Sequence, residues 1–329
     1  MPQLARRRNA SFFGWAALLV IALTSGAARA GAYYLPDSGD ALIGFEQLAT
    51  AAQEDTMLDI GRKYNVGANE IKLANPNVDT WIPGADTPVV IPTRFVIPDG
   101  EREGIVINLP EMRMYYFPKE KYDNRRIVVT YPISVGRGEW ETPQGATKVI
   151  AKQENPSWYP PASIRKEHAE AGDPLPAVVP PGPDNPLGEH SLRLALPGYL
   201  IHGTNKPFGI GMRVTHGCIR MYPENIKPLY ENVPLGTPVR IVHQPYKVGW
   251  WKDQLYVEVH TPDEVDPPID EMAYLALVRE KWAQKYPADS LDLAFARKLL
   301  TGTRGMPVRM RRQDDVAVEG SDPQPLRIR

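Results

Sequence analysis

The sequence predicts a mainly β protein, in which a β-sandwich of short strands over residues 104–243 lies between a small α+β unit and a helical extension. Three observations support this fold class. Apolar and polar residues alternate in GIVINLPEMRMYYF (104–117), as in a β-hairpin. RRIVVTYPISVG (125–136) and GTPVRIVH (236–243) are rich in β-branched residues. The chain also contains 34 prolines and 26 glycines, which favour short strands joined by turns.

Residues 1–30 have the pattern of an export signal. Three arginines at positions 6–8 precede an almost wholly apolar run at 12–23, and Ala-Arg-Ala at 28–30 matches a signal-peptidase site. An uncleaved membrane anchor is the alternative, but the apolar run is shorter than the ~20 residues that a span requires. We therefore expect a signal peptide at residues 1–30 and an exported mature chain.

The mature chain is acidic and contains a single cysteine. The whole sequence has 38 Lys and Arg against 39 Asp and Glu, and residues 1–30 contain four arginines and no acid, so their removal lowers the formal charge from −1 to −5. An acidic chain is a poor partner for nucleic acid, and none is expected. With one cysteine, the mature protein must be stabilised by its apolar core and not by disulfides within the chain.

Residues 44–93 predict a small unit of two helices between two strands. Apolar residues recur at helical spacing in 57–64 and again in 71–74, an Asn-Pro-Asn turn follows, and PVVIP (88–92) predicts a strand. The helix start at Asp-Thr, the stretch LANPNVD and the closing VVIP resemble a LysM domain, a module that binds the N-acetylglucosamine-containing glycan of cell walls. Glu54 stands where LysM domains usually have glycine, and a plain helical spacer is the alternative.

Residues 246–300 predict an appendage that packs on the β domain. GWWKDQLYVEVH (249–260) begins as an alternating strand, and Leu275, Val278 and Trp282 recur on one face of a helix. Residues 301–329 show no apolar period and mix Arg, Asp, Gly and Pro, so we expect a disordered tail there.

The candidate catalytic residues concentrate in one segment, YLIHGTNKPFGIGMRVTHGCIRMYPENI (199–226). His202 follows an apolar pair, and His216 stands two positions before Cys218. Several glycines between His202 and Cys218 permit tight turns that can bring an imidazole beside the thiol. Only the thiolate is a nucleophile, and a free thiol titrates near ~8.5. A histidine within hydrogen-bond reach can take that proton and later return it to a leaving group, so the spacing favours a thiol nucleophile.

Three other roles are open to a lone cysteine: metal ligand, half of a disulfide between chains, and buried apolar residue. Two histidines and a cysteine are possible zinc ligands, but no second cysteine or nearby carboxylate completes the set, and His216-Gly217-Cys218 is tighter than the usual ligand spacing. Nothing indicates an exposed thiol for a disulfide between chains. A buried apolar cysteine is common in general, yet such residues seldom lie in a glycine-rich turn beside a histidine.

The same segment resembles the catalytic motif of the L,D-transpeptidases (YkuD domain), in which a His-Gly pair is followed some fifteen residues later by Ser/Thr-x-Gly-Cys-x-Arg. Similar segments occur upstream: NPSWYPPASIRKEH, NPLGEHSLRLALPGYLIHGTN and ISVGRGEWETPQG. The resemblance covers residues 104–243. Together with the signal peptide, the LysM-like unit and the extension, it points to the ErfK/YbiS/YcfS/YnhG subgroup of Gram-negative envelopes, and hence to the periplasm.

The resemblance implies a role for each motif residue. Cys218 is the expected nucleophile, which expels D-alanine from a peptidoglycan tetrapeptide stem, and His202 is the expected proton donor and acceptor. His216 is expected to support the thiolate or orient the site, although a packed histidine fits equally well. The Gly217 and Cys218 N–H groups are expected to bind the oxyanion, and Gly217 to leave room for the peptide.

Four further residues are expected to bind substrate. Arg220 can bind a substrate carboxylate, with a salt bridge to the turn 223–225 as the alternative. Thr215 stands where many members of the family have serine. Trp158 and Tyr159 lie in a Pro-flanked loop expected to form part of a lid, with core packing as the alternative.

Three functions remain open at this point. The first is a transpeptidase that passes the acyl group to an amine, either the lysine of an outer-membrane lipoprotein or the diamino acid of a second stem. The second is a hydrolase at the same site, with water as the acceptor. The third is a non-catalytic protein that binds peptidoglycan through the LysM-like unit. None of them requires a cofactor or metal.

Overall fold

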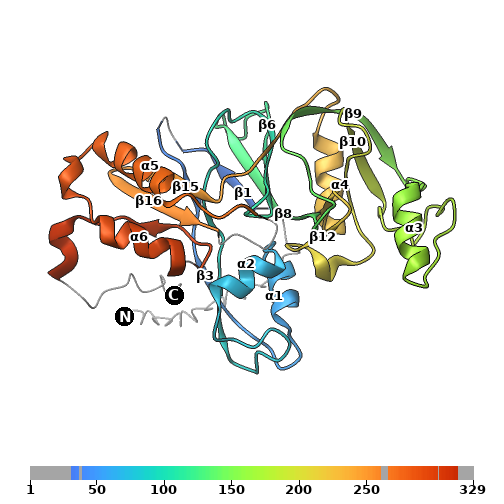
Figure 1. Cartoon of the computed structure of the whole chain (residues 1–329), viewed down its shortest axis with the longest axis horizontal. Coiled ribbons are helices and arrows are strands. Elements are labelled where there is room, and N and C mark those ends of the chain that lie inside the picture. The colour runs from blue at the N-terminus through green and yellow to red at the C-terminus, as the bar shows by residue number, and fades with distance from the viewer. Residues whose placement is uncertain (1–30, 37–38, 261–265, 303, 318–329) are drawn as a thin grey trace, which may run out of the picture.

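The computed structural model describes residues 31–36, 39–260, 266–302 and 304–317 (Figure 1). The predicted signal peptide lies outside these residues. Within them, no helix has the length and apolarity that a membrane crossing would need.

The main sheet confirms the mainly β fold class. Its order is β1-β8-β13-β11-β10-β9-β14-β6-β7, β12 pairs with β8, and a β7–β8 pairing closes the ring, so the strands form one continuous sheet. Helix α4 (Pro223–Asn232) covers the apolar interior, and α3 (Ala162–Glu170) lies beyond β9 and β10. The strands are β1 (Gly31–Tyr34), β6 (Gly104–Asn108), β7 (Arg113–Phe117), β8 (Ile127–Gly136), β9 (Gly145–Glu154), β10 (His190–Leu194), β11 (Leu200–His202), β12 (Arg213–Thr215), β13 (Ile219–Met221) and β14 (Pro238–Val242).

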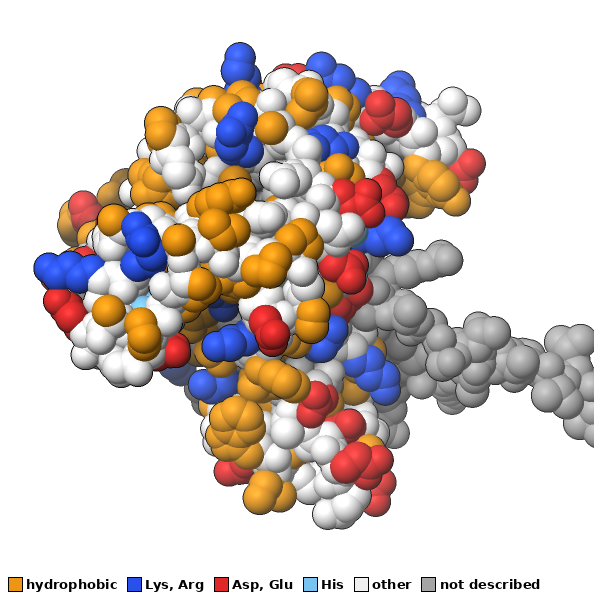
Figure 2. Space-filling model, turned by 90° about the vertical axis from the view of Figure 1, so that its right-hand side faces the viewer, with side chains coloured by type: hydrophobic (Ala, Val, Ile, Leu, Met, Phe, Trp, Pro, Cys, Tyr) orange, Lys and Arg blue, Asp and Glu red, His pale blue; other side chains and the backbone are white. Residues whose placement is uncertain are grey.

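The N-terminal unit (residues 47–91) has the order strand–helix–helix–strand: β3 (Gln47–Thr50), α1 (Met57–Lys63), α2 (Ala68–Ala74) and β4 (Pro88–Ile91). The two strands pair antiparallel, and the unit has a small apolar core of its own. A short ladder of β2 (Leu42–Gly44) and β5 (Arg94–Val96) flanks it. Apolar side chains are also exposed on this lower lobe of the molecule (Figure 2), where Trp81 is 65% and Ile82 74% exposed.

The C-terminal extension contains a three-stranded sheet covered by two helices. The sheet has the order β15-β16-β17, and α5 and α6 bury a separate apolar core against it. β17 and the buried Met310 lie within the range 301–329 where a disordered tail was expected, so that boundary is wrong. Residues 318–329 lie outside the described residues. The elements are β15 (Tyr246–Trp251), β16 (Gln254–Val259), α5 (Glu271–Ala283), α6 (Leu293–Gly302) and β17 (Val308–Arg309), with short 3₁₀ helices at Pro207–Gly209, Ala288–Ser290 and Gln313–Ala317.

Candidate active site

His202 and Cys218 belong to one face of two adjacent strands. β11 and β13 are parallel, with Ile201 opposite Ile219 and His202 opposite Arg220. Ile201 and Ile219 are fully buried in the core. Side chains alternate between the two faces of a strand, so His202, Arg220 and Cys218, which directly precedes β13, project from the opposite face. The fold therefore places the predicted imidazole and thiol on the same face of two adjacent strands.

Backbone contacts hold the His202 ring in one orientation. The ring is buried, and its Nδ1 lies 2.6 Å from the carbonyl oxygen of Gly203, so we assign the hydrogen to Nδ1. This tautomer leaves Nε2 able to accept a proton. Burial and the nearby positive charge of Arg220 lower the pKa of His202 to about 3. The imidazole is consequently neutral at pH 7.

The Cys218 thiol is half-buried and lies 3.7 Å from the carbonyl oxygen of Gly198. Burial raises its pKa, whereas the Leu200 backbone N–H and the positive charge of Arg220 favour the thiolate and partly oppose this effect. The resting site therefore pairs a protonated thiol with a neutral imidazole.

Arg220 supplies a positive charge beside the thiol. It is half-buried, and its Nε has no hydrogen-bond partner in the part of the chain that the structure describes. The alternative expected from sequence, an ion pair with the turn 223–225, is not formed: Glu224 pairs with Arg62 at 2.8 Å. The buried Nε therefore leaves one hydrogen-bond donor of this cation unsatisfied among the described residues.

Thr215 and Gly217 shape the turn before Cys218. The buried Thr215 hydroxyl donates to the Cys218 carbonyl oxygen at 2.6 Å and accepts the Gly217 N–H at 3.2 Å. Thr215 therefore holds the turn together, and its expected role in substrate binding stays a prediction. The Gly217 N–H is also occupied, so the expected pair of oxyanion donors is reduced to the Cys218 N–H.

Gly217 is required by conformation. Its φ is +97°, a region that L side chains rarely adopt, and a Cβ there would lie 2.8 Å from the Tyr199 ring. Its carbonyl accepts the Thr142 hydroxyl at 2.8 Å, and the same hydroxyl accepts the Gly136 N–H at 2.9 Å. This bridge fixes the turn to the end of β8.

His216 joins the same turn to helix α3. Its Nε2 lies 2.6 Å from Glu167 Oε2 and 3.3 Å from Arg137 Nη2, and Arg137 also pairs with Glu167. The Trp140 ring packs edge-on against the imidazole at 5.0 Å. Hydrogen bonds from Arg137 and His216 lower the pKa of Glu167. Of the two expected roles for His216, this geometry favours orientation of the site.

Trp158 and Tyr159 lie near the start of the excursion, the segment between β9 and β10 (residues 155–189) that contains α3. Trp158 is half-buried and exchanges two backbone hydrogen bonds of 2.9 Å with Val179, whereas Tyr159 is 68% exposed. The fully buried Asn185 ties the excursion together through bonds to the carbonyl groups of residues 156, 179 and 180. Trp158 is thus held in place, and Tyr159 is free to meet a ligand.

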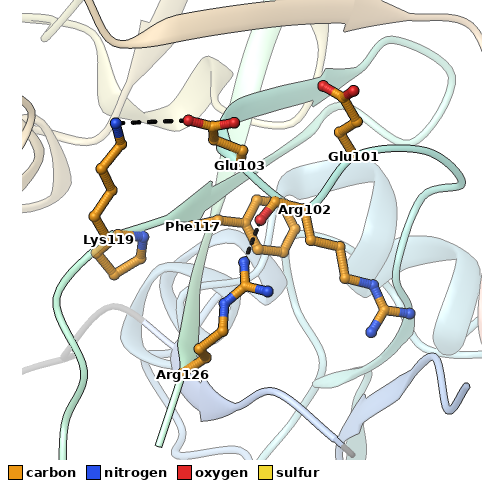
Figure 3. Close-up of a pocket in the computed structure, with 7 residues that line it drawn as sticks. Glu101, Arg102, Glu103, Phe117, Lys119 and Arg126 are labelled. Carbon is orange, nitrogen blue, oxygen red and sulfur yellow. Dashed lines mark hydrogen bonds and ion pairs between the residues drawn. The ribbon is translucent and has the colours of Figure 1, made fainter. Parts of the chain in front are cut away.

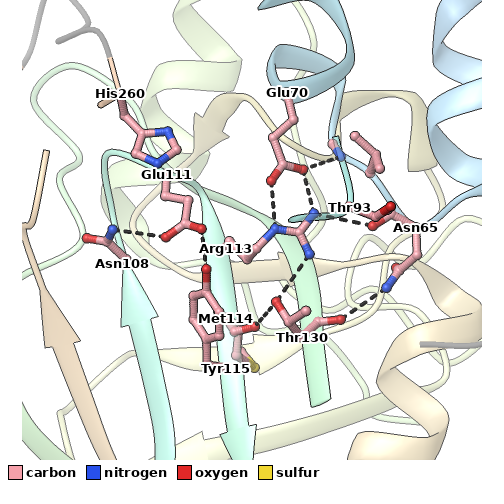
Figure 4. A network of polar contacts seen from close by, with 12 residues as sticks. Asn65, Glu70, Thr93, Asn108, Glu111, Arg113, Met114, Tyr115, Thr130 and His260 are labelled. Atoms are coloured by element: carbon pink, nitrogen blue, oxygen red, sulfur yellow. Dashed lines mark hydrogen bonds and ion pairs between the residues drawn. The ribbon is translucent and has the colours of Figure 1, made fainter. Parts of the chain in front are cut away.

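A cluster of possible metal ligands lies away from the Cys218 motif. Among the described residues, only Glu111, Glu258 and His260 cluster closely enough to bind a metal ion. Figure 4 shows two of these side chains, Glu111 and His260, in the polar network beneath the N-terminal unit. The Lys247 ammonium lies 2.8 Å from both carboxylates and supplies the cation itself.

A surface pocket on the β6–β7 side is unrelated to the thiol. Its lining residues include Phe117, Lys119 and Arg126. Figure 3 shows that two of its cationic side chains interact with other residues of the pocket lining: Lys119 pairs with Glu103, and Arg126 donates to the Arg102 carbonyl oxygen.

Sequence reasoning missed the residues that hold the turn at residues 215–218, called the catalytic turn below. Glu167, Arg137 and Thr142 come from α3 and the β8–β9 loop, far from the motif in sequence. Arg137 and Thr142 lie within the segment ISVGRGEWETPQG, whose resemblance to the family was the available signal. Glu167 likewise lies within the family-like segment NPSWYPPASIRKEH, but neither segment indicates that it pairs with His216.

The mainly β fold thus has a thiol and a buried imidazole on one face of adjacent strands. The family model described as the L,D-transpeptidase catalytic domain (YkuD) matches residues 102–241. Probable L,D-transpeptidase YcfS of Escherichia coli K12 is 40% identical over 92% of this chain and 94% of its own length. For probable L,D-transpeptidase YbiS of the same strain, the values are 38%, 90% and 96%. The chain belongs to the L,D-transpeptidase family.

Solved structures of the family overlap the catalytic part. The catalytic domain of the Enterococcus faecium L,D-transpeptidase superposes with a TM-score of 0.32 and 22% identity, covering 44% of this chain and all of that domain. Probable L,D-transpeptidase ErfK/SrfK of Salmonella typhimurium is 37% identical in sequence over 92% of this chain and 97% of its own length.

Proposed function

We propose that this protein is a periplasmic L,D-transpeptidase in which Cys218 accepts the acyl group of a peptidoglycan tetrapeptide stem and passes it to an amine. The supporting observation is the placement of His202, Arg220 and Cys218 on one face of adjacent strands. The family of the chain and the export pattern of residues 1–30 agree with this activity and location.

The first half-reaction forms a thioester. As the Cys218 sulfur attacks the carbonyl of the diamino acid, its proton moves to Nε2 of His202, and the carbonyl electron pair moves onto oxygen near the Cys218 N–H. Collapse of this intermediate breaks the bond to D-alanine, and His202 returns the proton to the departing amine. Because the resting thiol is protonated and the ring neutral, proton transfer accompanies attack.

The second half-reaction transfers the acyl group. The acceptor amine attacks the thioester, His202 takes the amine proton, and the sulfur leaves and recovers a proton. Arg220, whose buried Nε has no partner among the described residues, binds the carboxylate of the donor stem. The proposed acceptor is a lysine of an outer-membrane lipoprotein, and the diamino acid of a second stem is the competing amine.

The N-terminal unit is proposed to bind wall glycan as a LysM domain does. Its strand–helix–helix–strand order and the exposed Trp81 and Ile82 between α2 and β4 support this assignment. Aromatic and apolar side chains exposed in this way are suited to contact with sugar rings.

Mass spectrometry of muropeptides incubated with pure protein tests the activity. Joined products with release of D-alanine are expected from the wild type, and Cys218→Ala should form none. Trimmed stems without joined products would identify a hydrolase. Full activity of Cys218→Ala would overturn the mechanism.

A further inference from the structure

We propose that the N-terminal unit is also a positioning element of the active site, so that chemistry at Cys218 depends on it even when the substrate contains no glycan. The inference depends on the proposed function of Cys218. The unit contacts the chain on both sides of the catalytic turn, before it at residues 210–211 and after it at residues 222–225.

The contact before the turn is made by backbone. The Ala68 N–H donates to the Ile210 carbonyl oxygen at 2.8 Å, and the Asn69 N–H to the Gly211 carbonyl oxygen at 3.3 Å. A Cβ on Gly211, whose φ is +86°, would lie 2.4 Å from the Ala68 nitrogen, and a Cβ on Gly67 would lie 2.8 Å from the Gly211 Cα. The two backbones meet at a distance that only glycine permits.

The contact after the turn is made by side chains. The buried Asn225 of α4 donates to the Asn65 side-chain oxygen at 2.6 Å. Arg62 forms two bonds of 2.8 Å with Glu224, and the Tyr222 hydroxyl donates to a backbone carbonyl of the unit at 3.3 Å. These residues directly follow β13.

The segment from Ile210 to Asn225 contains β12, the catalytic turn and β13, and the unit bonds it at both ends. Beneath these contacts, Arg113 of β7 forms a buried bidentate ion pair with Glu70 of the unit. Figure 1 shows α1 and α2 against this side of the sheet, beside β12. A shift of about 1 Å in a catalytic group can cost on the order of 100-fold in rate, so a body fixed to this segment influences catalysis.

A domain that only delivers the enzyme to the wall predicts a different result. Loss of a delivery domain weakens action on polymeric peptidoglycan but leaves the turnover of a free stem peptide unchanged. Displacement of a positioning element lowers kcat for the free peptide as well. Glycan-free tetrapeptide with an amine acceptor therefore separates the two roles.

Gly67→Ala is the appropriate variant. Gly67 has φ −78° and ψ 161°, which alanine adopts without strain, so the added methyl group acts through its contacts, the tightest of them 2.8 Å from the Gly211 Cα, with Glu70 Oε2 at 3.2 Å and Pro132 Cβ at 3.3 Å. We expect kcat for the glycan-free peptide to fall roughly 10-fold with KM nearly unchanged. Alkylation of Cys218 by iodoacetamide should become roughly threefold faster, because a loosened turn exposes the thiol.

Val278→Ala controls for general destabilisation, because Val278 is fully buried in the C-terminal core, away from the catalytic turn. It should leave both rates within twofold of wild type. If Gly67→Ala fails to fold, Asn225→Ala tests the other contact with the same readouts. A folded variant with unchanged kcat and alkylation rate overturns the proposal. If the wild type does not turn over the peptide, the proposed function fails, and the alkylation rates alone decide the positioning role.

Discussion

The two appendages are attached to one hairpin of the main sheet by buried cations. Among the described residues, the N-terminal unit bonds the segment 210–225 at both ends, whereas the C-terminal side meets it at β12, where Asp266 pairs with Arg213. Arg113 of β7 meets Glu70 of the N-terminal unit at 2.6 and 2.7 Å. Two residues earlier, Glu111 meets Lys247 of the C-terminal extension at 2.8 Å, and Lys247 also contacts Glu258 (Figure 4 shows the hairpin). If the proposed positioning role holds, similar buried ion pairs serve stability in the extension and catalysis in the N-terminal unit, and the variants below separate the two.

The C-terminal pair should give the largest loss of stability. Lys247→Met leaves Glu111 and Glu258 buried without their cation. Burial alone raises the pKa of Glu258, and the stronger combined effect of Lys247 and His260 lowers it. Breaking such a cluster costs about 3–5 kcal/mol in the free energy of unfolding, measurable by urea denaturation. The folded variant should keep the wild-type kcat, and a large fall in kcat would contradict the comparison.

Glu70→Gln should cost somewhat less stability but also reduce activity. The amide keeps some hydrogen bonds to Arg113 and loses the charge, so we expect a loss of about 3 kcal/mol in the free energy of unfolding. Because this pair lies beneath the contacts at Ile210 and Gly211, kcat for the glycan-free peptide should fall as well. A stability loss with unchanged kcat would reduce the N-terminal unit to the same structural role as the extension.

The buried imidazole adds a pH dependence at higher pH than the carboxylate of the C-terminal interface, whose pKa is lowered. The pKa of His202 is about 3 in the folded protein and near ~6.5 unfolded, so between these values the unfolded chain binds more protons. Stability from this group is present above pH 6.5 and falls with acidification, by about 1.4 kcal/mol per pH unit. His202→Asn, whose amide can donate to Gly203 in place of Nδ1, should remove that slope from urea midpoints at pH 4.5–6. Equal slopes in both proteins would contradict the buried, neutral ring.

The sequence pattern predicted those features that depend on residues close together in the chain. The order of elements in the N-terminal unit and the hairpin at 104–117 follow from apolar periodicity, and the motif around Cys218 follows from glycine spacing. Pairing across long separations was not predictable. β1 joins β8 almost a hundred residues away, and β17, in a stretch without periodicity, is ordered by its pairing with β16. For the same reason, the contact of Glu167 with His216 has no signature in either segment.

That contact gives the smallest expected effect on stability. Glu167 is partly exposed and pairs with Arg137 and His216, so Glu167→Gln should leave the urea midpoint unchanged. His216 lies two residues from the nucleophile, and loss of the carboxylate frees the turn from α3. We expect kcat/KM to fall roughly 3- to 10-fold. Glu170→Gln on the same helix, where the carboxylate meets only the exposed Lys166, is the matched control and should have no effect. Equal kinetics for the two variants would show that the contact of the turn with α3 does not contribute to catalysis.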